Sequence, residues 1–285
     1  MNNLLVTGCK GQLGSEIKAL AERYVTYNFY FTDSKELDIT NHAGVHEFIK
    51  TNNISIIINC AAHTAVDKAE SDQAMAAKLN HLAVENFATI AKERNIKLIH
   101  ISTDYVFDGT NYMPYTENEK TNPQSVYGST KLAGEKAMQE INPTNSIIIR
   151  TSWVYSSFGN NFVKTMLRLG NERTELGVIV DQIGTPTYAR DLAKTILEII
   201  PKLTNNKVEI YHFSNKGVAS WYDFAKAIFD IKEIDIQLNA IETSQYPTAA
   251  KRPFYSVLNK NNIENTFQIE IPNWRDSLKE CLQEI

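Results

Sequence analysis

A glycine triplet near the N-terminus, Gly8, Gly11 and Gly14, is the sequence feature that most constrains the fold. It directly follows the short apolar stretch Leu4–Thr7 and directly precedes Glu16–Arg23, whose apolar residues recur at helical spacing. Glycines are needed in such a strand-to-helix turn because side chains would block the tight turn, a bound pyrophosphate and the helix packing. The pattern predicts a dinucleotide-binding unit, with a mere tight turn as the alternative.

Apolar segments alternate with helical patterns along the rest of the first half. The predicted strands are Leu4–Thr7, Tyr27–Thr32, Ile54–Ala62, Lys97–Thr103 and Ser146–Trp153, and the predicted helices between them include Val45–Lys50, Asp72–Arg94 and Tyr127–Gln139. This alternation predicts an α/β fold with a doubly wound, Rossmann-like parallel sheet.

The C-terminal part is less regular, and its pattern predicts a smaller α/β substrate lobe that is interleaved with the last units of the sheet rather than cleanly separate. Its predicted helices are Asn161–Leu169, Ala189–Ile199, Ser220–Phe229 and Trp274–Gln283, and its predicted strands are Val178–Asp181 and Glu209–Phe213. The expected dinucleotide-binding domain therefore covers 1–150 plus about 185–205, and the substrate-binding lobe covers 151–184 and 206–285.

Composition narrows the classes of function. In 285 residues the net charge is −4 and no basic run occurs, which argues against nucleic-acid binding. The longest weakly polar run, Ile54–Ala62, is too short for a membrane span, and Leu4–Val6 is too short for a secretory signal. Three scattered cysteines, Cys9, Cys60 and Cys281, suit neither a disulfide framework nor a metal site, so we expect a cytoplasmic protein.

Two tyrosine–lysine pairs have the spacing that places both side chains on one helix face. They are Tyr127 with Lys131 and Tyr222 with Lys226. The first pair comes one element after Thr103, a hydroxyl residue at the carboxyl end of a predicted strand, where ligands bind in parallel sheets. The second pair lies in an apolar stripe without such a setting. The sequence therefore favours the first pair as catalytic and the second as ordinary packing.

Reduction of a ketone by a reduced nicotinamide explains why these residue types occur together. Negative charge develops on the carbonyl oxygen and must be protonated, and a tyrosine with a pKa near 10 is a slow acid–base group. A lysine ammonium at about 4 Å would stabilise the phenolate by up to about 4 kcal/mol, or about three pKa units. We therefore expect Lys131 to lower the pKa of Tyr127 and to bind the nicotinamide ribose.

Asp33 ends the second predicted strand, 19 residues after Gly14, where a carboxylate binds the ribose 2′-hydroxyl of NAD. A solvated strand end is the alternative. Lys10 and Lys35 are close in sequence to these features and would tolerate the 2′-phosphate of NADP. The sequence thus predicts NADH or NADPH without choosing between them.

The motifs together resemble the extended short-chain dehydrogenase/reductase superfamily. The segments that carry this resemblance are Thr7–Gly14, Ser102–Gly109 and Tyr127–Lys131. Four further segments resemble the dTDP-4-dehydrorhamnose reductases within it: Cys60–Glu70, Arg150–Tyr155, Gly159–Met166 and Asp181–Thr187. The resemblance implies reduction of the C4 keto group of dTDP-4-dehydro-L-rhamnose to dTDP-L-rhamnose by NAD(P)H.

The resemblance also implies roles for individual residues. Tyr127 would be the proton donor, Lys131 its partner and Thr103 the hydroxyl that binds the carbonyl. Residues implied to bind the cofactor are Gly8, Gly11, Gln12, Leu13, Gly14, Asp33, Asp38, Ile39, Ala62, His63 and Thr64, together with Tyr127 and Lys131. Residues implied to bind the sugar nucleotide are Thr103, Asp104 and Trp153.

Several alternatives stay open at this stage. A reductase producing the other C4 epimer, or one acting on a related dTDP-deoxyhexulose, would have the same motifs. A noncatalytic subunit like the regulatory subunit of methionine adenosyltransferase would keep the cofactor loop. Some members of the family bind magnesium between subunits through glutamates; Glu16 suits this role, but Arg190 stands at a second expected position, so we expect no metal. A homodimer is possible.

Overall fold

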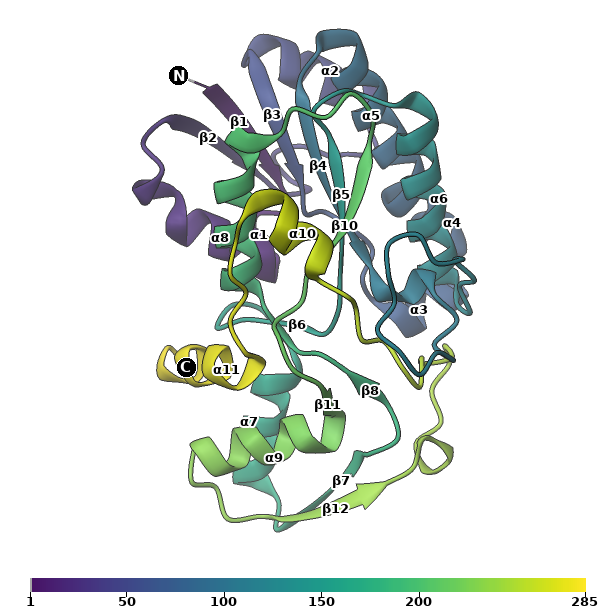
Figure 1. Ribbon diagram of the computed structural model, residues 1–285, viewed down its shortest axis with the longest axis vertical. Coiled ribbons are helices and arrows are strands. Elements are labelled where there is room, and N and C mark those ends of the chain that lie inside the picture. The colour runs from purple at the N-terminus through teal and green to yellow at the C-terminus, as the bar shows by residue number, and fades with distance from the viewer. Residues whose placement is uncertain (1) are drawn as a thin grey trace.

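A parallel sheet of six strands forms the centre of the fold (Figure 1). The structure is a computed structural model that describes residues 2–285. The strands are β1 (Asn2–Thr7), β2 (Tyr27–Thr32), β3 (Ile54–Asn59), β4 (Lys97–Thr103), β5 (Ile147–Thr151) and β10 (Glu209–His212). Their order across the sheet is β10-β5-β4-β3-β1-β2. The predicted doubly wound α/β fold is confirmed.

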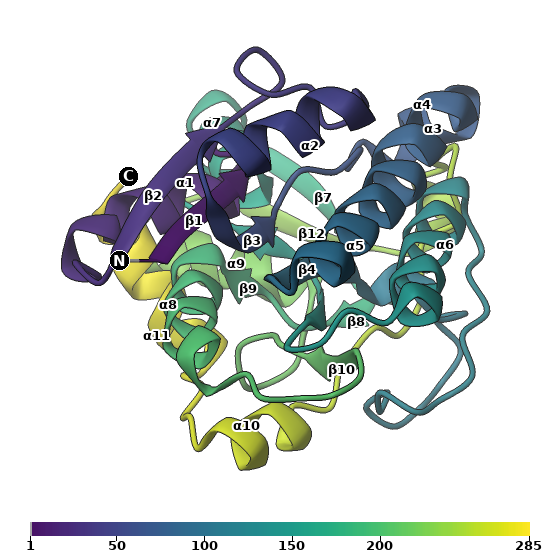
Figure 2. The same ribbon diagram turned by 90° about the horizontal axis from the view of Figure 1, so that it is seen from above.

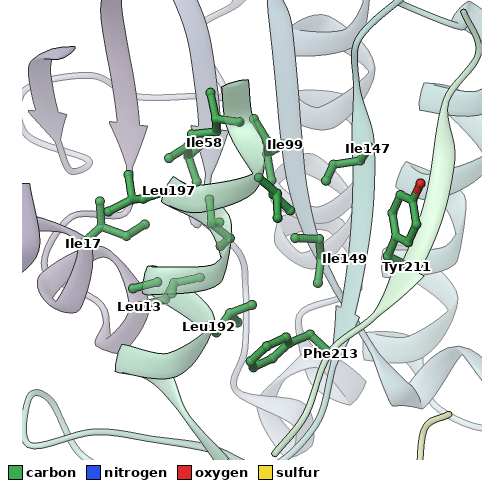
Figure 3. Close-up of a cluster of buried hydrophobic side chains, with 14 of the residues drawn as sticks. Leu13, Ile17, Ile58, Ile99, Ile147, Ile149, Leu192, Leu197, Tyr211 and Phe213 are labelled. Carbon is green, nitrogen blue, oxygen red and sulfur yellow. The ribbon is translucent and has the colours of Figure 1, made fainter. Parts of the chain in front are cut away.

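Alternating side chains of the strands pack against helices on both faces of the sheet (Figure 2). On one face, Leu4 and Val6 of β1 join a buried cluster with α1 (Gln12–Leu20) and α8 (Ala189–Ile199), as Figure 3 shows for Leu13, Ile17 and Leu192. On the other face, Leu5 packs with α2 (His42–Thr51), α5 (Ala83–Arg94) and α6 (Val126–Ile141). Burial on both faces explains the nearly continuous apolar character of the strands.

The helix predicted over 72–94 is present from Gln73 to Arg94, but it contains a π-helical turn that the prediction lacked. The structure has α3 (Val66–Ser71), α4 (Gln73–Ala77), a π-helical turn at Lys78–Leu82 and then α5. In the π-helical turn the buried Asn80 side chain accepts from the His63 amide at 2.8 Å and donates to its carbonyl at 3.2 Å. Apolar periodicity does not report such a long-range contact, so the π-helical turn was not predictable from the pattern.

The C-terminal segments pack around a separate buried cluster, below the sheet in Figure 1. The helices are α7 (Phe162–Glu172), α9 (Trp221–Ile231) and α11 (Trp274–Gln283). The strands form three pairs: β7 (Glu175–Ile179) with β12 (Gln237–Ile241), β6 (Val154–Tyr155) with β9 (Thr187–Tyr188), and β8 (Ile183–Gly184) with β11 (Ala219–Ser220). No helix within residues 2–285 is both long and apolar enough to cross a bilayer.

One segment differs from the expected assignment to the lobe. The boundary predicted at 206 puts Glu209–His212 in the lobe, but β10 pairs in parallel with β5 and completes the large sheet. Helix α10 (Asn261–Phe267) also returns to this sheet, where Ile263 and Phe267 join the first cluster. The chain thus crosses between the sheet and the C-terminal cluster several times, and sequence pattern does not show which strand each segment pairs with. The division at the other boundaries stays a prediction.

Candidate active site

A cavity of about 740 Å³ opens at the carboxyl ends of the central strands. Strand β1 lies between β2 and β3, and α1, which follows β1, covers the opposite face of the sheet from α5, which follows β3, so a crevice forms between these two strands. Most of the predicted site residues line the cavity: Gly8, Gly11, Gln12, Leu13, Gly14, Asp33, Asp38, Ile39, Ala62, Thr64, Thr103, Asp104, Tyr127, Lys131 and Trp153.

The glycine loop is packed so closely that side chains would not fit in it. Gly8 has φ of +66°, and a side chain there would lie 2.9 Å from the backbone of Ala61. A side chain at Gly14 would collide with the carbonyl oxygen of Gly8. Helix α1 begins with no side chain bonded to its first amides, and the buried Gln12 Oε1 has no partner in the described chain. Free amides at a helix start bind anions, so the loop fits a dinucleotide pyrophosphate.

Charges of both signs meet at the predicted ribose end of the cavity. Asp33 follows β2 directly, and its carboxylate forms an ion pair with the Lys10 ammonium. It also accepts from the Lys35 backbone amide at 2.8 Å. The carboxylate suits a ribose hydroxyl, and the adjacent ammonium suits a phosphate.

Thr103 and Asp104 form a buried polar corner where β4 ends. The Thr103 hydroxyl donates to Asp104 Oδ1 at 3.0 Å and accepts from the Tyr105 amide at 3.2 Å, which caps a short 3-10 turn. Asp104 Oδ2 is buried without a partner among residues 2–285. Burial raises the pKa of Asp104 to about 7, although the hydrogen bond from Thr103 and the nearby Ser256 hydroxyl oppose the rise.

Tyr127 lies in the first turn of α6, which Ser125 caps by accepting from the Gly128 amide. Its ring packs edge-on against Tyr105, with centroids 5.5 Å apart. Burial raises the pKa of Tyr127, and the neighbouring Thr103 hydroxyl opposes the rise. The phenol is therefore protonated near neutral pH.

The expected lowering of the Tyr127 pKa by Lys131 is wrong for this structure. Lys131 is buried, and its Nζ donates to the Ile101 carbonyl at 2.5 Å and lies 3.2 Å from His100 Nε2. Helical spacing puts both side chains on one face, but buried acceptors on β4 decide where the long lysine side chain ends. The second pair differs: Lys226 is exposed and bonds Asp230, and Tyr222 lines neither of the two large cavities.

A second cavity of about 1170 Å³ adjoins the first and is lined largely by the C-terminal segments. The two share five lining residues: Thr64, Val66, Tyr105, Trp153 and Trp221. Trp153 has the unusual φ of +47° and stacks on Trp221, with ring centroids 3.6 Å apart. Sequence reasoning missed Trp221 because its place in an apolar stripe is typical of core packing.

The family comparison agrees with this geometry. A family model described as RmlD substrate binding domain matches residues 1–285. The chain belongs to this family. Within the RmlD family, a dTDP-4-dehydrorhamnose reductase of Aggregatibacter actinomycetemcomitans is 43% identical over 98% of this chain and 98% of its own length. The spore coat polysaccharide biosynthesis protein SpsK of Bacillus subtilis is 37% identical over 100% of this chain and 98% of its own. The resemblance inferred from the motifs is confirmed.

Solved structures of RmlD-family relatives show the same fold. The dTDP-4-dehydrorhamnose reductase of Bacillus anthracis str. Ames, in complex with NADP, is 38% identical, covers 100% of both chains and has a TM-score of 0.95. The ortholog of Clostridium acetobutylicum is 43% identical, covers 99% of this chain and 98% of its own, and has a TM-score of 0.92.

Two residues considered for binding roles, His63 for the cofactor and Glu16 for magnesium, contact protein groups instead. His63 does not line the cofactor cavity formed by the described residues, and its backbone is held by Asn80 instead. Glu16 accepts from Arg190 Nε at 2.8 Å, and the same guanidinium bonds Glu284. An arginine thus lies between the two carboxylates.

Proposed function

We propose that the chain is an NAD(P)H-dependent oxidoreductase that reduces the C4 keto group of dTDP-4-dehydro-L-rhamnose to give dTDP-L-rhamnose. The observation that carries the proposal is the meeting of two cavities at Trp153: the first contains the glycine loop, Thr103 and Tyr127, and the second is large enough for a nucleotide sugar. The RmlD-family relatives named dTDP-4-dehydrorhamnose reductase support the choice of substrate.

Gly8, Gly11 and Gly14 would hold the pyrophosphate of the cofactor, Asp33 and Lys10 its adenosine ribose, and Lys131 its nicotinamide ribose. The reduced nicotinamide supplies a hydride to the keto carbon when bound. A cofactor bound along the crevice from the glycine loop would have its nicotinamide end near Thr103 and Tyr127, which line the same cavity.

Tyr127 would supply the proton that the keto oxygen gains. Because burial raises the pKa of Tyr127, the phenol is protonated and ready to donate near neutral pH. The carbonyl then gains a hydride at carbon and a proton at oxygen, and the phenolate left behind regains its proton from solvent. The Thr103 hydroxyl would orient the carbonyl and stabilise the charge that develops on its oxygen.

The second cavity suits the charge of a nucleotide diphosphate. Arg168, Arg173 and Arg252 all line it, and Asp67 is the one carboxylate on its described walls. Arg252 Nη2 donates to Asp67 Oδ2 at 2.5 Å, and Arg168 Nη1 donates to Glu172 Oε2 at 2.7 Å. Among residues 2–285, Arg173 is therefore the one of the three whose guanidinium has no carboxylate partner and would meet a phosphate first. Trp153, which lines both cavities, would contact the sugar at their junction.

The test is to give the purified protein the substrate together with NADPH or with NADH. Loss of the near-ultraviolet absorbance of the reduced nicotinamide is the expected result, and NMR of the product identifies its C4 epimer. If the protein binds NADPH or NADH but oxidises neither, the reductase assignment is overturned and a noncatalytic subunit is favoured.

We also propose a cytoplasmic homodimer. The three cysteines are free in the structure, as a reducing compartment requires. Light scattering of the eluting protein during size-exclusion chromatography measures the molar mass, and a monomer would contradict the dimer.

A further inference from the structure

A chain of buried polar side chains runs from the glycine loop to Lys131. Thr7, the last residue of β1, donates from Oγ1 to Asn59 Oδ1 at 2.7 Å. Asn59, the last residue of β3, lies with its Nδ2 3.2 Å from His100 Nδ1, and His100 Nε2 lies 3.2 Å from Lys131 Nζ. All four residues are at most 1% exposed. This row of hydrogen-bonded side chains therefore links the neighbouring strands β1, β3 and β4 to helix α6 behind the wall of the cofactor cavity.

His100 is a neutral imidazole. Burial and the nearby Lys131 charge hold its pKa well below the ordinary value. A neutral imidazole has one nitrogen that donates and one that accepts, and the two roles can be exchanged between the nitrogens. His100 can therefore either accept a hydrogen bond from Lys131 or donate one to it.

Lys131 needs a partner of this kind because its own charge is easily lost. Burial lowers the pKa of Lys131 to about 8, and the Glu135 carboxylate and Cys60 oppose this lowering. Glu135 is already bonded to Arg150, and burial raises the pKa of the Cys60 thiol, so the thiol is neutral and supplies no charge to Lys131 near neutral pH. The Ile101 carbonyl accepts one hydrogen from Nζ in either state, so the imidazole is the partner whose role has to change.

We propose that His100 is a positioning residue that holds Lys131 Nζ in the cofactor cavity whether this nitrogen is an ammonium or an amine. In the ammonium state, Nε2 accepts from Nζ while Nδ1–H donates to the oxygen of a turned Asn59 amide. In the amine state, Asn59 Nδ2 donates to Nδ1 while Nε2–H donates to Nζ. Asn59 Oδ1 accepts from Thr7 Oγ1 in the observed orientation, and in the turned amide Nδ2 would donate to the same oxygen, so the link to the residue before the glycine loop is kept in both states.

The proposal deepens the proposed function, because it concerns the lysine assigned to the nicotinamide ribose. Its test, however, measures Lys131 directly and does not require turnover. In the NMR spectrum of protein labelled with ¹³C-lysine, the Cε signal of Lys131 is assigned as the signal that disappears in the Lys131→Arg variant. Its chemical shift against pH gives the titration midpoint of this lysine.

Two variants at position 100 distinguish the effect of the hydrogen bond to Lys131 from the effect of having any polar side chain there. In His100→Gln the amide reaches the place of Nε2 and keeps a partner for Lys131. In His100→Asn the shorter side chain places its amide only where Nδ1 lies, so the contact with Asn59 is kept and the contact with Lys131 is lost. We expect the midpoint to stay near the wild-type value in the glutamine variant and to fall by about one pH unit in the asparagine variant, because an ammonium loses a charge-assisted hydrogen bond.

His212→Asn is the matched control. His212 is also a fully buried histidine on a strand of the large sheet, but its Nδ1 lies 3.1 Å from the Tyr115 carbonyl, and β5 lies between its strand β10 and the strand β4 of His100. It should lose stability without moving the midpoint of Lys131. An unchanged midpoint in His100→Asn, or an equal shift in His212→Asn, would overturn the proposal.

The pH profile of kcat/KM provides a second measurement if the protein is the proposed reductase. Its alkaline limb should move to lower pH in His100→Asn by the same amount as the NMR midpoint. Absence of reductase activity in the wild type would refute the proposed function and leave the NMR test of His100 intact.

Discussion

The indole rings of Trp153 and Trp221 stack at the junction of the two cavities, with centroids 3.6 Å apart and planes inclined by 8°. Trp153 has a left-handed backbone conformation, with φ of +47°, which costs a non-glycine residue about 1–2 kcal/mol. A side chain at Gly184 would lie 2.6 Å from the Trp153 ring, so this glycine leaves space for the indole. Trp221 on α9 and Gly184 on β8 therefore hold a strained residue where the proposed substrates meet.

Trp221→Ala should weaken substrate binding more than cofactor binding. Without the stacked ring, Trp153 loses about 0.5–1.5 kcal/mol of aromatic interaction together with its support. We expect KM for the dTDP-sugar to rise about tenfold, equivalent to about 1.4 kcal/mol, while the Kd of NADPH from fluorescence titration stays within about twofold. For Trp221→Phe, KM for the dTDP-sugar should lie between the values of the wild type and of Trp221→Ala. An equal loss for both ligands would contradict the supporting role of this ring.

Tyr127→Phe should remove most turnover and leave cofactor binding intact. Loss of a general acid typically reduces the rate by about 10²–10⁴-fold. Tyr222→Phe is the matched control, because Tyr222 has the same spacing to a lysine and lies outside both cavities. Initial rates of NADPH oxidation compare the two variants, and a similar kcat for both would exclude Tyr127 as the proton donor.

The buried ion pair of Glu135 and Arg150 should matter for stability. Arg150 Nη2 donates to Glu135 Oε2 at 2.6 Å, and the two side chains are 3% and 0% exposed respectively. Glu135→Gln leaves the Arg150 charge buried without its counter-ion, so the free energy of unfolding should fall by about 3–5 kcal/mol.

Glu172→Gln is the control for this pair, because the bond between Arg168 and Glu172 is exposed on α7. Its removal should change the free energy of unfolding by less than about 1 kcal/mol. Urea unfolding followed by circular dichroism measures both variants, and equal losses would show that burial does not determine the effect.

The contribution of Asp104 to the free energy of unfolding should decrease as pH rises. Its folded-state pKa of about 7 lies above the value of about 3.9 in an unfolded chain. Between these values the folded protein holds a proton that the unfolded chain has released. The contribution is therefore complete below about pH 4, decreases by about 1.4 kcal/mol per pH unit, and is lost above about pH 7.

Asp104→Asn cannot titrate and keeps the acceptor for Thr103. The difference in free energy of unfolding between wild type and this variant should decrease with that slope from pH 4 to 7. Taking the difference removes the titration of His100 and His212, whose pKa values are lowered by burial and which act in the opposite direction. A difference that is constant with pH would show that Asp104 is ionised throughout.

Local patterns in the sequence were sufficient for much of the fold. The spacing of apolar residues predicted β2 and β4 with their observed bounds, and predicted α8 and α11 in the same way. Strand, helix and turn preferences act over a few residues, so such elements can be inferred without knowledge of the partners. The π-helical turn at Lys78–Leu82 and the place of β10 in the sheet depend on distant contacts and were not found.

The sequence by itself determined which residues gather at the cofactor cavity, because the carboxyl ends of parallel strands meet at one edge and the glycine loop follows the first of them. Only the tertiary structure decided what these side chains contact. Spacing brings Lys131 to the face of Tyr127, but buried acceptors on β4 hold its ammonium at His100 and Ile101. Likewise Trp153 and Trp221, 68 positions apart by their numbers, stack only because the C-terminal segments fold back over the sheet edge. Contacts between distant segments depend on packing and desolvation in three dimensions, which local sequence patterns do not encode.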